Sequence, residues 1–323
     1  MRVADLDEAE LLERLLPHLP SRALLGPGDD AAVVAAPDAR VVATTDVLVE
    51  ERDFRRDWST GADVGWKAVA QNVADVAAMG ATCTGLLIAL GLPGELEVAW
   101  VEDFAAGVAD ACRALGAVVV GGDLSGASEV VVAVTALGDL GGRAPVLRSG
   151  ARPGDVVALA GRPGRSAAGL ELLRAGRLDG PAPVEDLLTA HRRPEPPVAL
   201  GPAAAAAGAS ALMDVSDGLL RDAGRIAAAS GAVLDLHLTG TALGESAAEL
   251  AAATGAGRAA ADSWVLTGGE DHGLLACFPR HARPPAGFRA VGRVLAGAGE
   301  RAVLVDGRPW AGGGVGWDHF RNR

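Results

Sequence analysis

The sequence predicts a two-domain protein in which both domains mix helices and strands. The 323 residues, half of them hydrophobic, exceed the roughly 150 that one ordinary domain takes. Runs rich in Val and Thr alternate with segments of helical periodicity in both halves. A stretch rich in Gly, Pro and Arg at 138–155 separates these halves, so we expect domains at 1–142 and 143–323.

The elements of the first half follow from apolar spacing and helix-end signals. We expect helices at 1–17, 59–80 and 99–115 and strands at 40–50, 117–123 and 129–138. Thr60 and Asp63 have the spacing of a capping box for the second helix, and Gly80 can end it. The segment "GGDLSG" reads as a Gly-rich turn in which Asp123 follows its strand.

The second half is expected to begin with a strand at 155–161 and a helix at 166–176. A Pro-rich connector at 191–202 follows. We attribute the Ala-rich run at 201–211 to the overall amino-acid composition of the chain, which is rich in alanine. A short strand at 210–215 leads into a helix at 217–230. The remainder alternates strand-like runs with Gly-rich loops.

Charge and composition exclude several classes of protein. A formal net charge of −12 argues against nucleic acid and anionic membranes as partners. No apolar run approaches the roughly 20 residues of a spanning helix. The N-terminus carries acids where a signal peptide carries bases, which indicates a cytoplasmic protein. Cys83, Cys112 and Cys277 have neither metal-site nor disulfide spacing, so we expect buried small hydrophobes.

Acidic and hydroxyl side chains gather where the predicted strands begin or end. Five segments supply them: Asp29 and Asp30; Thr44, Thr45 and Asp46; Asp75; Asp123; and Asp214, Ser216 and Asp217. Asp75 differs because it lies within a helix, on the same side as Gln71 and Asn72. Carboxylate and hydroxyl oxygens are the ligands of hard cations, so the pattern indicates Mg²⁺. No His or Cys cluster suggests zinc.

Each segment alone also has an ordinary structural interpretation. An Asp beside a strand is commonly a turn residue or a helix cap, and 216–218 is typical of a helix N-terminus. Both interpretations stay open for Asp214 and Asp217, which would repel each other without a cation. The turns "GPGDD", "GGDLSG", "GRPGRSAAG" and "TGGEDHG" let backbone N–H groups approach an anion. Since no Walker A motif or dinucleotide fingerprint occurs, the sequence indicates an ATP user of another kind.

An ordered set of motifs resembles one family over nearly the whole chain. These are "GPGDDAAV", "TTDVLVE", "NVADVAAMGA", "GGDLSG", "LRSGARPGD", "MDVSDGLLRD", "GGED" and the closing "GWDHF". From about residue 26 onward they resemble the thiamine-monophosphate kinases of the aminoimidazole ribonucleotide synthetase-like superfamily. Several of the motifs are shared across the superfamily, whereas "GGED" with "DHF" is more specific to the thiamine enzymes.

The resemblance implies a two-domain fold and an activity. The N-terminal domain would be α/β, with a sheet that pairs with a second subunit in a homodimer, and the C-terminal domain would be α+β. ATP would phosphorylate thiamine monophosphate directly to thiamine diphosphate in an in-line transfer that needs several Mg²⁺ ions. No residue would act as general base, because the acceptor phosphate is already largely ionised at neutral pH.

The resemblance also implies roles for individual residues. Mg²⁺ ligands would be Asp30, Thr44, Thr45, Asp46, Asp75, Asp123, Asp214 and Asp217. Gly122, Arg148 and Ser216 would contact ATP, and Asp53, Glu270 and Trp317 would contact the substrate. Three segments depart from the family pattern. Asp53 stands where His is usual, His272 and Gly273 replace Tyr and Glu, and Arg165 stands where Asp is frequent.

Two alternatives remain at this point. Another ATP-using enzyme of the superfamily is one, although the reactive Cys and Lys of selenophosphate synthetase and the Cys-bearing tail of the hydrogenase-maturation relative are missing. A non-catalytic nucleotide-binding homologue is the other. It would be expected to have lost metal ligands, and the proposed ligands are all present in the sequence.

Overall fold

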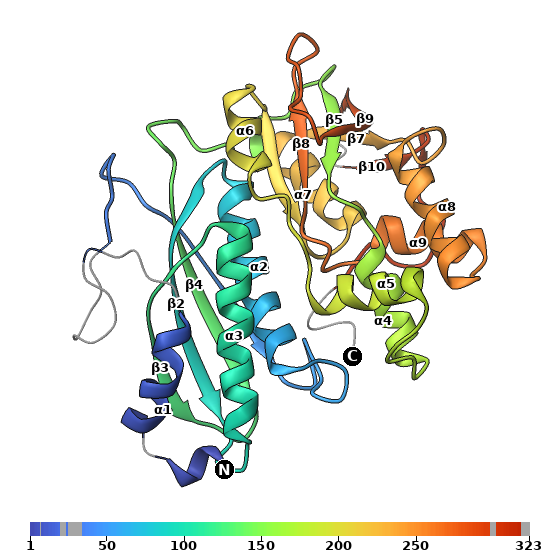
Figure 1. Cartoon of the computed structure of the whole chain (residues 1–323). Helices are drawn as coiled ribbons and strands as arrows, with labels where there is room; N and C mark the ends of the chain where they lie inside the picture. Colours follow the sequence, from blue (N-terminus) through green and yellow to red (C-terminus); the bar gives the residue numbers. More distant parts are fainter. Residues whose placement is uncertain (7, 20–23, 25–33, 298–301, 318–323) are drawn as a thin grey trace. The chain divides into compact units, whose positions relative to one another are not determined.

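The structure, a computed structural model, describes residues 1–6, 8–19, 24, 34–297 and 302–317. The chain divides into two compact units, Met1–Val76 with Ala81–Gly142 and Ala77–Gly80 with Arg143–Arg323. Each unit contains a sheet and helices of its own (Figure 1). None of the described helices is long and apolar enough to cross a bilayer.

The described sheet of the first unit has the strand order β1-β4-β2-β3. Its strands are β1 (Val42–Val49), β2 (Thr82–Leu92), β3 (Val119–Gly126) and β4 (Val131–Asp139). Only β2 and β3 pair in parallel; β4 is antiparallel to its neighbours. The three predicted strands are confirmed and β2 is additional. The predicted Gly-rich turn is wrong, because β3 continues through Asp123 and pairs it with Ala89.

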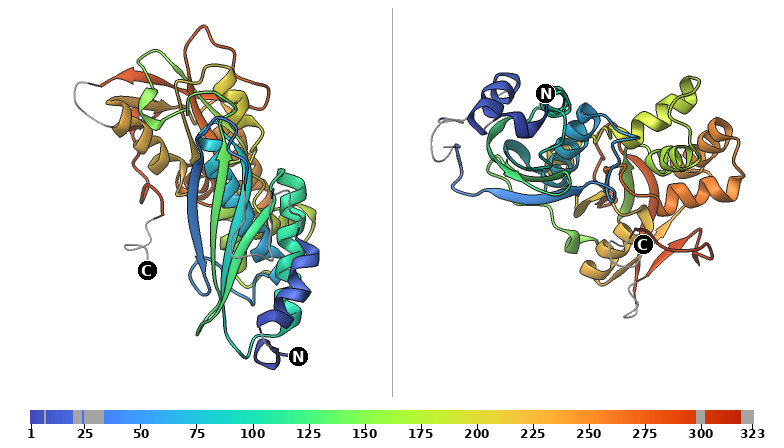
Figure 2. Two further views of the ribbon diagram at one scale, coloured as in Figure 1. Left: turned by 90° about the vertical axis from the view of Figure 1, so that its left-hand side faces the viewer. Right: turned by 90° about the horizontal axis from the view of Figure 1, so that it is seen from below.

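The helices of the first unit are α1 (Glu8–Leu15), α2 (Gly61–Ala78) and α3 (Val98–Leu115). The predicted capping box is confirmed, since Thr60 N donates to Asp63 Oδ2 at 2.9 Å and Asp63 N donates to Thr60 Oγ1 at 3.2 Å. Helices α2 and α3 approach backbone to backbone: a Cβ on Gly65 would lie 2.3 Å from the Phe104 carbonyl oxygen. Both helices lie on the same side of the sheet (Figures 1 and 2).

The two faces of this sheet differ in burial. Alternate residues of β2 such as Leu86 and Ile88 are buried. On the opposite face, which we call the open face, Val47 and Leu87 are 50% and 38% exposed. The row Val47, Ala133, Ala89 and Asp123 runs across the open face from one edge strand to the other.

The described sheet of the second unit has the order β11-β10-β7-β9-β5-β8-β6. Its strands are β5 (Val156–Ala160), β6 (Ala211–Val215), β7 (Ala232–Leu236), β8 (Gly273–Phe278), β9 (Arg289–Ala296), β10 (Val303–Val305) and β11 (Arg308–Pro309). β10 and β7 are parallel, and the other described neighbours are antiparallel. The predicted strands at 155–161 and 210–215 are confirmed.

Strands β5 and β6 of this sheet are buried on both faces. Alternation sends Leu159 and Met213 into one hydrophobic cluster and Ala158 and Leu212 into another. The helices around them are α4 (Arg165–Arg174), α5 (Ala182–Arg192), α6 (Leu200–Ala206), α7 (Leu219–Ser230), α8 (Ala242–Thr254) and α9 (Arg258–Thr267). Cys277 joins the first cluster, and all three cysteines are buried as expected.

The helices at 166–176 and 217–230 are confirmed as α4 and α7. Helices α5, α6, α8 and α9 were not predicted. In α6 and α8 the sequence is largely Ala, Gly and other small residues, which give little contrast between a buried and an exposed side. The Ala-rich run at 201–211, for which no secondary structure was predicted, thus contributes to a helix at Leu200–Ala206.

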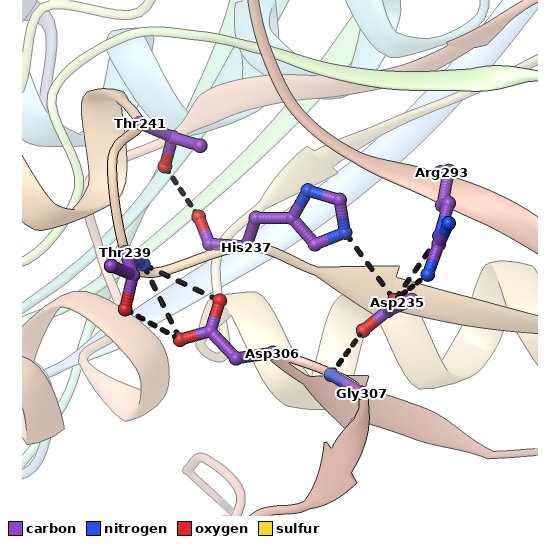
Figure 3. A network of polar contacts seen from close by, with 7 residues as sticks. All are labelled: Asp235, His237, Thr239, Thr241, Arg293, Asp306 and Gly307. Carbon is purple, nitrogen blue, oxygen red and sulfur yellow. Dashed lines mark hydrogen bonds and ion pairs between the residues drawn. The ribbon is translucent and has the colours of Figure 1, made fainter.

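A network around Asp235 fastens the β10–β11 hairpin to β7 (Figure 3). The Asp235 side chain is 1% exposed and accepts hydrogen bonds from Gly307 N at 2.8 Å and Arg293 Nη2 at 3.1 Å. His237 Nε2 lies 3.3 Å from the same carboxylate. Burial raises the pKa of Asp235, but the donors from Gly307, Arg293 and His237 outweigh it and leave the pKa below its ordinary value. The ionised carboxylate therefore stabilises the fold above the ordinary Asp pKa.

We predict that Asp235→Asn lowers the free energy of unfolding by roughly 1–3 kcal/mol at pH 7, because buried donors lose a charged acceptor. The deficit should shrink as the pH falls through the lowered pKa of Asp235, where the wild-type carboxylate also becomes neutral. Urea unfolding of both proteins from pH 7 to pH 3 measures it. Glu171→Gln, on an exposed i,i+3 pair with Arg174, is the control and should change stability by less than about 1 kcal/mol. Equal small losses in both variants would contradict the role of the network.

Candidate active site

In the first unit, β1 and α2 bring a hydroxyl and a carboxylate together. Alternation along β1 places Thr44 and Asp46 on the face opposite to Thr45 and Val47. Thr44 Oγ1 donates to Asp75 Oδ2 at 2.8 Å, so the acid of α2 contacts a strand and is not simply solvated. Of the two other polar residues on that side of α2, Gln71 is 9% exposed and Asn72 is fully buried.

Asn72 adds a further oxygen beside this pair. Its Nδ2 donates to the Ala68 carbonyl at 2.9 Å, whereas its buried Oδ1 has no hydrogen-bond partner among the described residues. A buried acceptor without a donor is costly, and a cation would satisfy it. The donor set on this side of α2 consists of carboxylate, hydroxyl and amide oxygens, which suits Mg²⁺.

Thr45, Gly122 and Asp123 lie apart from the Thr44–Asp75 pair. Thr45 Oγ1 donates to the Val134 carbonyl at 3.0 Å, and Asp123 is exposed on β3, at the far edge of the sheet from β1. Position 122 requires glycine, because a Cβ there would lie 2.0 Å from the Ile88 carbonyl oxygen. The described part of one chain therefore does not bring Asp123 to Asp46.

Two other site residues predicted in the first half of the chain are Asp30 and Asp53, of which the structure describes only Asp53. Asp30 lies outside the described residues. Asp53 is in the turn after β1, where its Oδ2 accepts a hydrogen bond from Val49 N at 2.8 Å. One oxygen of Asp53 thus closes that turn, and a substrate contact by this residue stays a prediction.

In the second unit, the turn between β6 and α7 carries the remaining acids. Asp214 is 3% exposed, and its Oδ2 has no hydrogen-bond partner among the described residues. His272 Nδ1 lies 3.6 Å from that oxygen, beyond hydrogen-bonding distance. A buried carboxylate oxygen left in this state is the strongest indication of a cation in the second unit.

Asp217 is balanced by arginines in this structure. Arg225 Nη2 bonds its carboxylate, and Arg221 Nε lies 3.7 Å from the same oxygen. The expectation that Asp214 and Asp217 simply repel each other is therefore incomplete. The ordinary interpretation of 216–218 as a helix N-terminus holds without a cap from Ser216: Gly218, at φ +118°, is the N-cap of α7, and no side chain caps it.

Sequence reasoning missed Asp222 and Arg225, although Asp222 ends the conspicuous segment "MDVSDGLLRD". Asp222 is fully buried, accepts a hydrogen bond from Asp217 N at 3.0 Å and pairs with Arg225 Nη1 at 2.5 Å. Burial and the neighbouring Asp214 raise the pKa of Asp222 to about 7, and Arg225 opposes them. Their i,i+3 spacing on α7 was the available signal, but the contact with Asp217 depends on the turn at Gly218.

The loop 268–272 lies against this turn and brings Glu270 and His272 with it. Glu270 N donates to the Ser216 carbonyl at 2.7 Å and His272 N to the Val215 carbonyl at 3.0 Å. A Cβ at Gly269 would lie 2.5 Å from the Ser216 carbonyl oxygen, which explains the second glycine of "GGED". Trp317 N donates to the Asp217 carbonyl at 2.7 Å.

The second unit thus gathers five predicted residues, namely Asp214, Ser216, Asp217, Glu270 and Trp317, and leaves out Arg148. The carbonyl of Arg148 accepts a hydrogen bond from Ser230, the last residue of α7. At about 1.5 Å per residue, the 12 residues of α7 separate this end from Ser216 by roughly 18 Å. Arg148 and Ser216 therefore cannot contact the same atom of a ligand within one unit.

The described residues of a single chain hold no cluster of three or more His, Cys, Asp and Glu side chains able to bind a metal ion. The oxygens that fit a hard cation are instead divided between the Thr44–Asp75–Asn72 group and Asp214. Oxygens of these types are the ligands that Mg²⁺ prefers. In the part of the chain that the structure describes, Asn72 Oδ1 and Asp214 Oδ2 are buried and accept no hydrogen bond.

Comparison with known proteins gives consistent matches. Residues 28–140 match the family model "AIR synthase related protein, N-terminal domain". The thiamine-monophosphate kinase of Mycobacterium tuberculosis is 48% identical over 98% of this chain and 92% of the relative. That of Corynebacterium glutamicum is 40% identical over 94% of this chain and 91% of the relative.

Solved structures agree with these relatives. The structure of AaThiL complexed with AMPPCP and TMP is 35% identical, covers 99% of both chains and has a TM-score of 0.79. The thiamine monophosphate kinase of Aquifex aeolicus gives 34% identity over 96% of this chain and 99% of the other, with a TM-score of 0.76. Hydrogenase maturation protein HypE in complex with ATP shares the fold, with a TM-score of 0.71 at 20% identity. Given relatives of up to 48% identity over almost the full chain, this protein belongs to the thiamine-monophosphate kinase family.

Proposed function

We propose that the protein transfers the γ-phosphoryl group of ATP to thiamine monophosphate and releases thiamine diphosphate and ADP. The observation that carries this proposal is the cluster of Asp214, Ser216, Asp217, Glu270 and Trp317 at one end of β6, on a chain of this family. The solved relative binds an ATP analogue and TMP. The family membership favours this activity over the alternatives of another superfamily enzyme or a non-catalytic homologue.

The chain's own residues would assist the transfer by binding and orientation. The acceptor phosphate is largely ionised at neutral pH, so no residue has to remove a proton. The barrier to overcome is repulsion between two polyanions. Mg²⁺ ions, when bound, would supply charge neutralisation and in-line alignment. Asp214 and Asp217 would hold them in the second unit, and Thr44, Thr45, Asp46, Asp75, Asp123 and Asp30 in the first.

Substrate recognition would fall to residues around the β6–α7 turn. Thiamine carries a positive charge, which suits the carboxylate of Glu270 and the ring of Trp317. Trp317 is 37% exposed, so its ring is accessible. ATP would contact Ser216, Gly122 and Arg148, of which the last two lie elsewhere in the fold. Asp53, in the turn after β1, remains a proposed substrate contact.

We also propose that the protein acts as a homodimer through the open face of the first sheet. The exposure of Val47 and Leu87 supports this proposal, because burying apolar side chains against a second subunit would stabilise the dimer. A second reason is the strand order. Asp46 and Asp123 lie on opposite edge strands, three spacings or about 14 Å apart along the sheet. Two carboxylates on one Mg²⁺ need oxygens within about 4 Å of each other. Because Asp46 and Asp123 are also on opposite faces of the sheet, a second subunit could supply the missing Asp123 only at the β1 edge, with its edge strand β3 beside Asp46.

The proposed activity predicts that ADP release from ATP and Mg²⁺ rises strongly when thiamine monophosphate is added. A coupled ADP assay with and without this acceptor, together with chromatography of thiamine diphosphate, measures it. Free thiamine is the control acceptor and should give little stimulation, because the site is built for a phosphate that needs no base. ATP binding without any stimulation by thiamine monophosphate would reject the kinase activity and favour the non-catalytic homologue.

We predict that Asp214→Asn reduces kcat by roughly 100-fold or more, because several kcal/mol of metal-based charge stabilisation are lost. Without Mg²⁺ the variant should be at least as stable as the wild type, since the substitution removes a buried charge with an unsatisfied oxygen. Mg²⁺ should raise the melting temperature of the wild type more than that of the variant. Asp262→Asn, on a helix pair with Arg258, is the control. Near wild-type turnover at saturating Mg²⁺ would exclude Asp214 as a ligand.

If each active site takes Asp46 from one subunit and Asp123 from the other, two inactive variants should complement each other in mixed dimers. Asp46→Asn and Asp123→Asn should each be inactive alone, whereas equal mixing after unfolding and refolding should restore about a quarter of wild-type activity, because half of the dimers are mixed and each has one intact site. The mass of the assembly is measured in parallel. If the mixture stays inactive while the proteins are dimeric, each site uses a single chain.

A further inference from the structure

We propose that His191 is a positioning residue that fixes the carboxylate of Glu270 toward the substrate. This inference rests on the proposed function, in which Glu270 meets the thiamine end of the acceptor. His191 lies in the last turn of α5 and is 6% exposed. The sequence motifs do not include His191. It contacts the loop 268–272 from α5, which is outside the β6–α7 turn and outside that loop.

The imidazole is held between a hydroxyl and the carboxylate. His191 Nδ1 lies 3.0 Å from Ser166 Oγ and 3.2 Å from Glu270 Oε2. An ionised carboxylate only accepts hydrogen bonds, so its position 3.2 Å from Nδ1 favours the tautomer with the proton on Nδ1, with Ser166 Oγ as a further acceptor. Ser166, at the start of α4, lies within hydrogen-bonding distance of the same nitrogen, and this second contact limits rotation of the ring. Helices α4 and α5 run beside each other in Figure 1.

The backbone of the loop supports a functional reason for this contact. Glu270 and His272 have φ angles of +63° and +49°, in the left-handed region that non-glycine residues rarely adopt because it is strained for them. Such strain persists where surrounding contacts determine the conformation. Glu270 N is tied to the Ser216 carbonyl at 2.7 Å, so the backbone is already fixed without the side chain.

Asp271 anchors the same loop from the other direction. Its two carboxylate oxygens accept Gly164 N at 2.6 Å and Ser166 N at 2.8 Å, at the N-terminus of α4. Ser166 is therefore fixed by Asp271, His191 lies against Ser166, and Glu270 lies against His191. These contacts connect Asp271, which anchors the loop 268–272, through Ser166 and His191 to the Glu270 side chain of the same loop. What His191 adds is the direction of that carboxylate, which is 34% exposed.

The backbone of the loop 268–272 and the His191 side chain therefore have different roles at the site. The loop backbone holds Glu270 beside the β6–α7 turn, and the imidazole selects the side-chain rotamer that presents the carboxylate to a cationic ring. Loss of the imidazole should weaken recognition of thiamine monophosphate and leave ATP recognition nearly unchanged. A purely structural role for His191 would instead disturb both substrates together.

The test compares His191→Leu, His191→Asn and Ser166→Ala with the control His281→Leu, which changes an exposed histidine of the same unit. His191→Leu should raise KM for thiamine monophosphate about tenfold, with KM for ATP changed less than about twofold. Asn places an amide N–H near the position of Nδ1 and should restore most of the loss. Ser166→Ala should give a smaller increase, and the control none.

A double-substitution cycle separates this role from general damage. In a Glu270→Ala background, His191→Leu should add less than about a twofold increase in KM, because the group that it positions is gone. Additive effects, no effect of His191→Leu, or equal increases in both KM values would overturn the inference. If His191→Leu does not fold, His191→Asn and Ser166→Ala carry the test with the same split between substrates. Failure of the proposed function is distinct, since the wild type itself would then show no turnover of thiamine monophosphate.

Discussion

The hydrogen bond from Glu270 N to the Ser216 carbonyl is the contact on which the second unit's site depends. It joins the loop before β8 to the turn after β6, two segments more than fifty residues apart in the chain. The glycine at 269 permits this approach, because a side chain there would collide with the same carbonyl. Once the two segments are joined, the acids of one and the carboxylate of the other lie at the same place.

Charge compensation is the second constraint, and it differs from one carboxylate to the next. Asp235 is satisfied by Arg293 and backbone N–H groups, and Asp271 by the start of α4. Asp222 and Asp217 share Arg225. Among the described residues, Asp214 keeps one buried oxygen without a hydrogen bond. The first four acids are therefore explained by the fold, whereas the described residues leave one oxygen of Asp214 unsatisfied, which supports its proposed role as a Mg²⁺ ligand.

The accuracy of the sequence predictions follows the strength of the local signal. The β-branched run of β1 and the capping box of α2 are local patterns, and both are confirmed. Helices α6 and α8 were missed because Ala-rich segments give weak periodicity. Asp123 was expected after its strand because glycines usually interrupt strands. In the fold, Gly122 lies inside β3, where the Ile88 carbonyl leaves no space for a side chain.

The sequence by itself determined the family, the alternation of helices and strands and the acidic residues that suit Mg²⁺, because motif order and residue chemistry are local properties. Only the tertiary structure decided which of these residues meet. It joined Thr44 to Asp75, separated Arg148 from Ser216 by the length of α7, and placed Asp46 and Asp123 on opposite edges of a sheet. It also brought His191 to Glu270. Such contacts depend on strand order and helix packing, which involve residues far apart in the chain and leave no spacing to be read in the sequence.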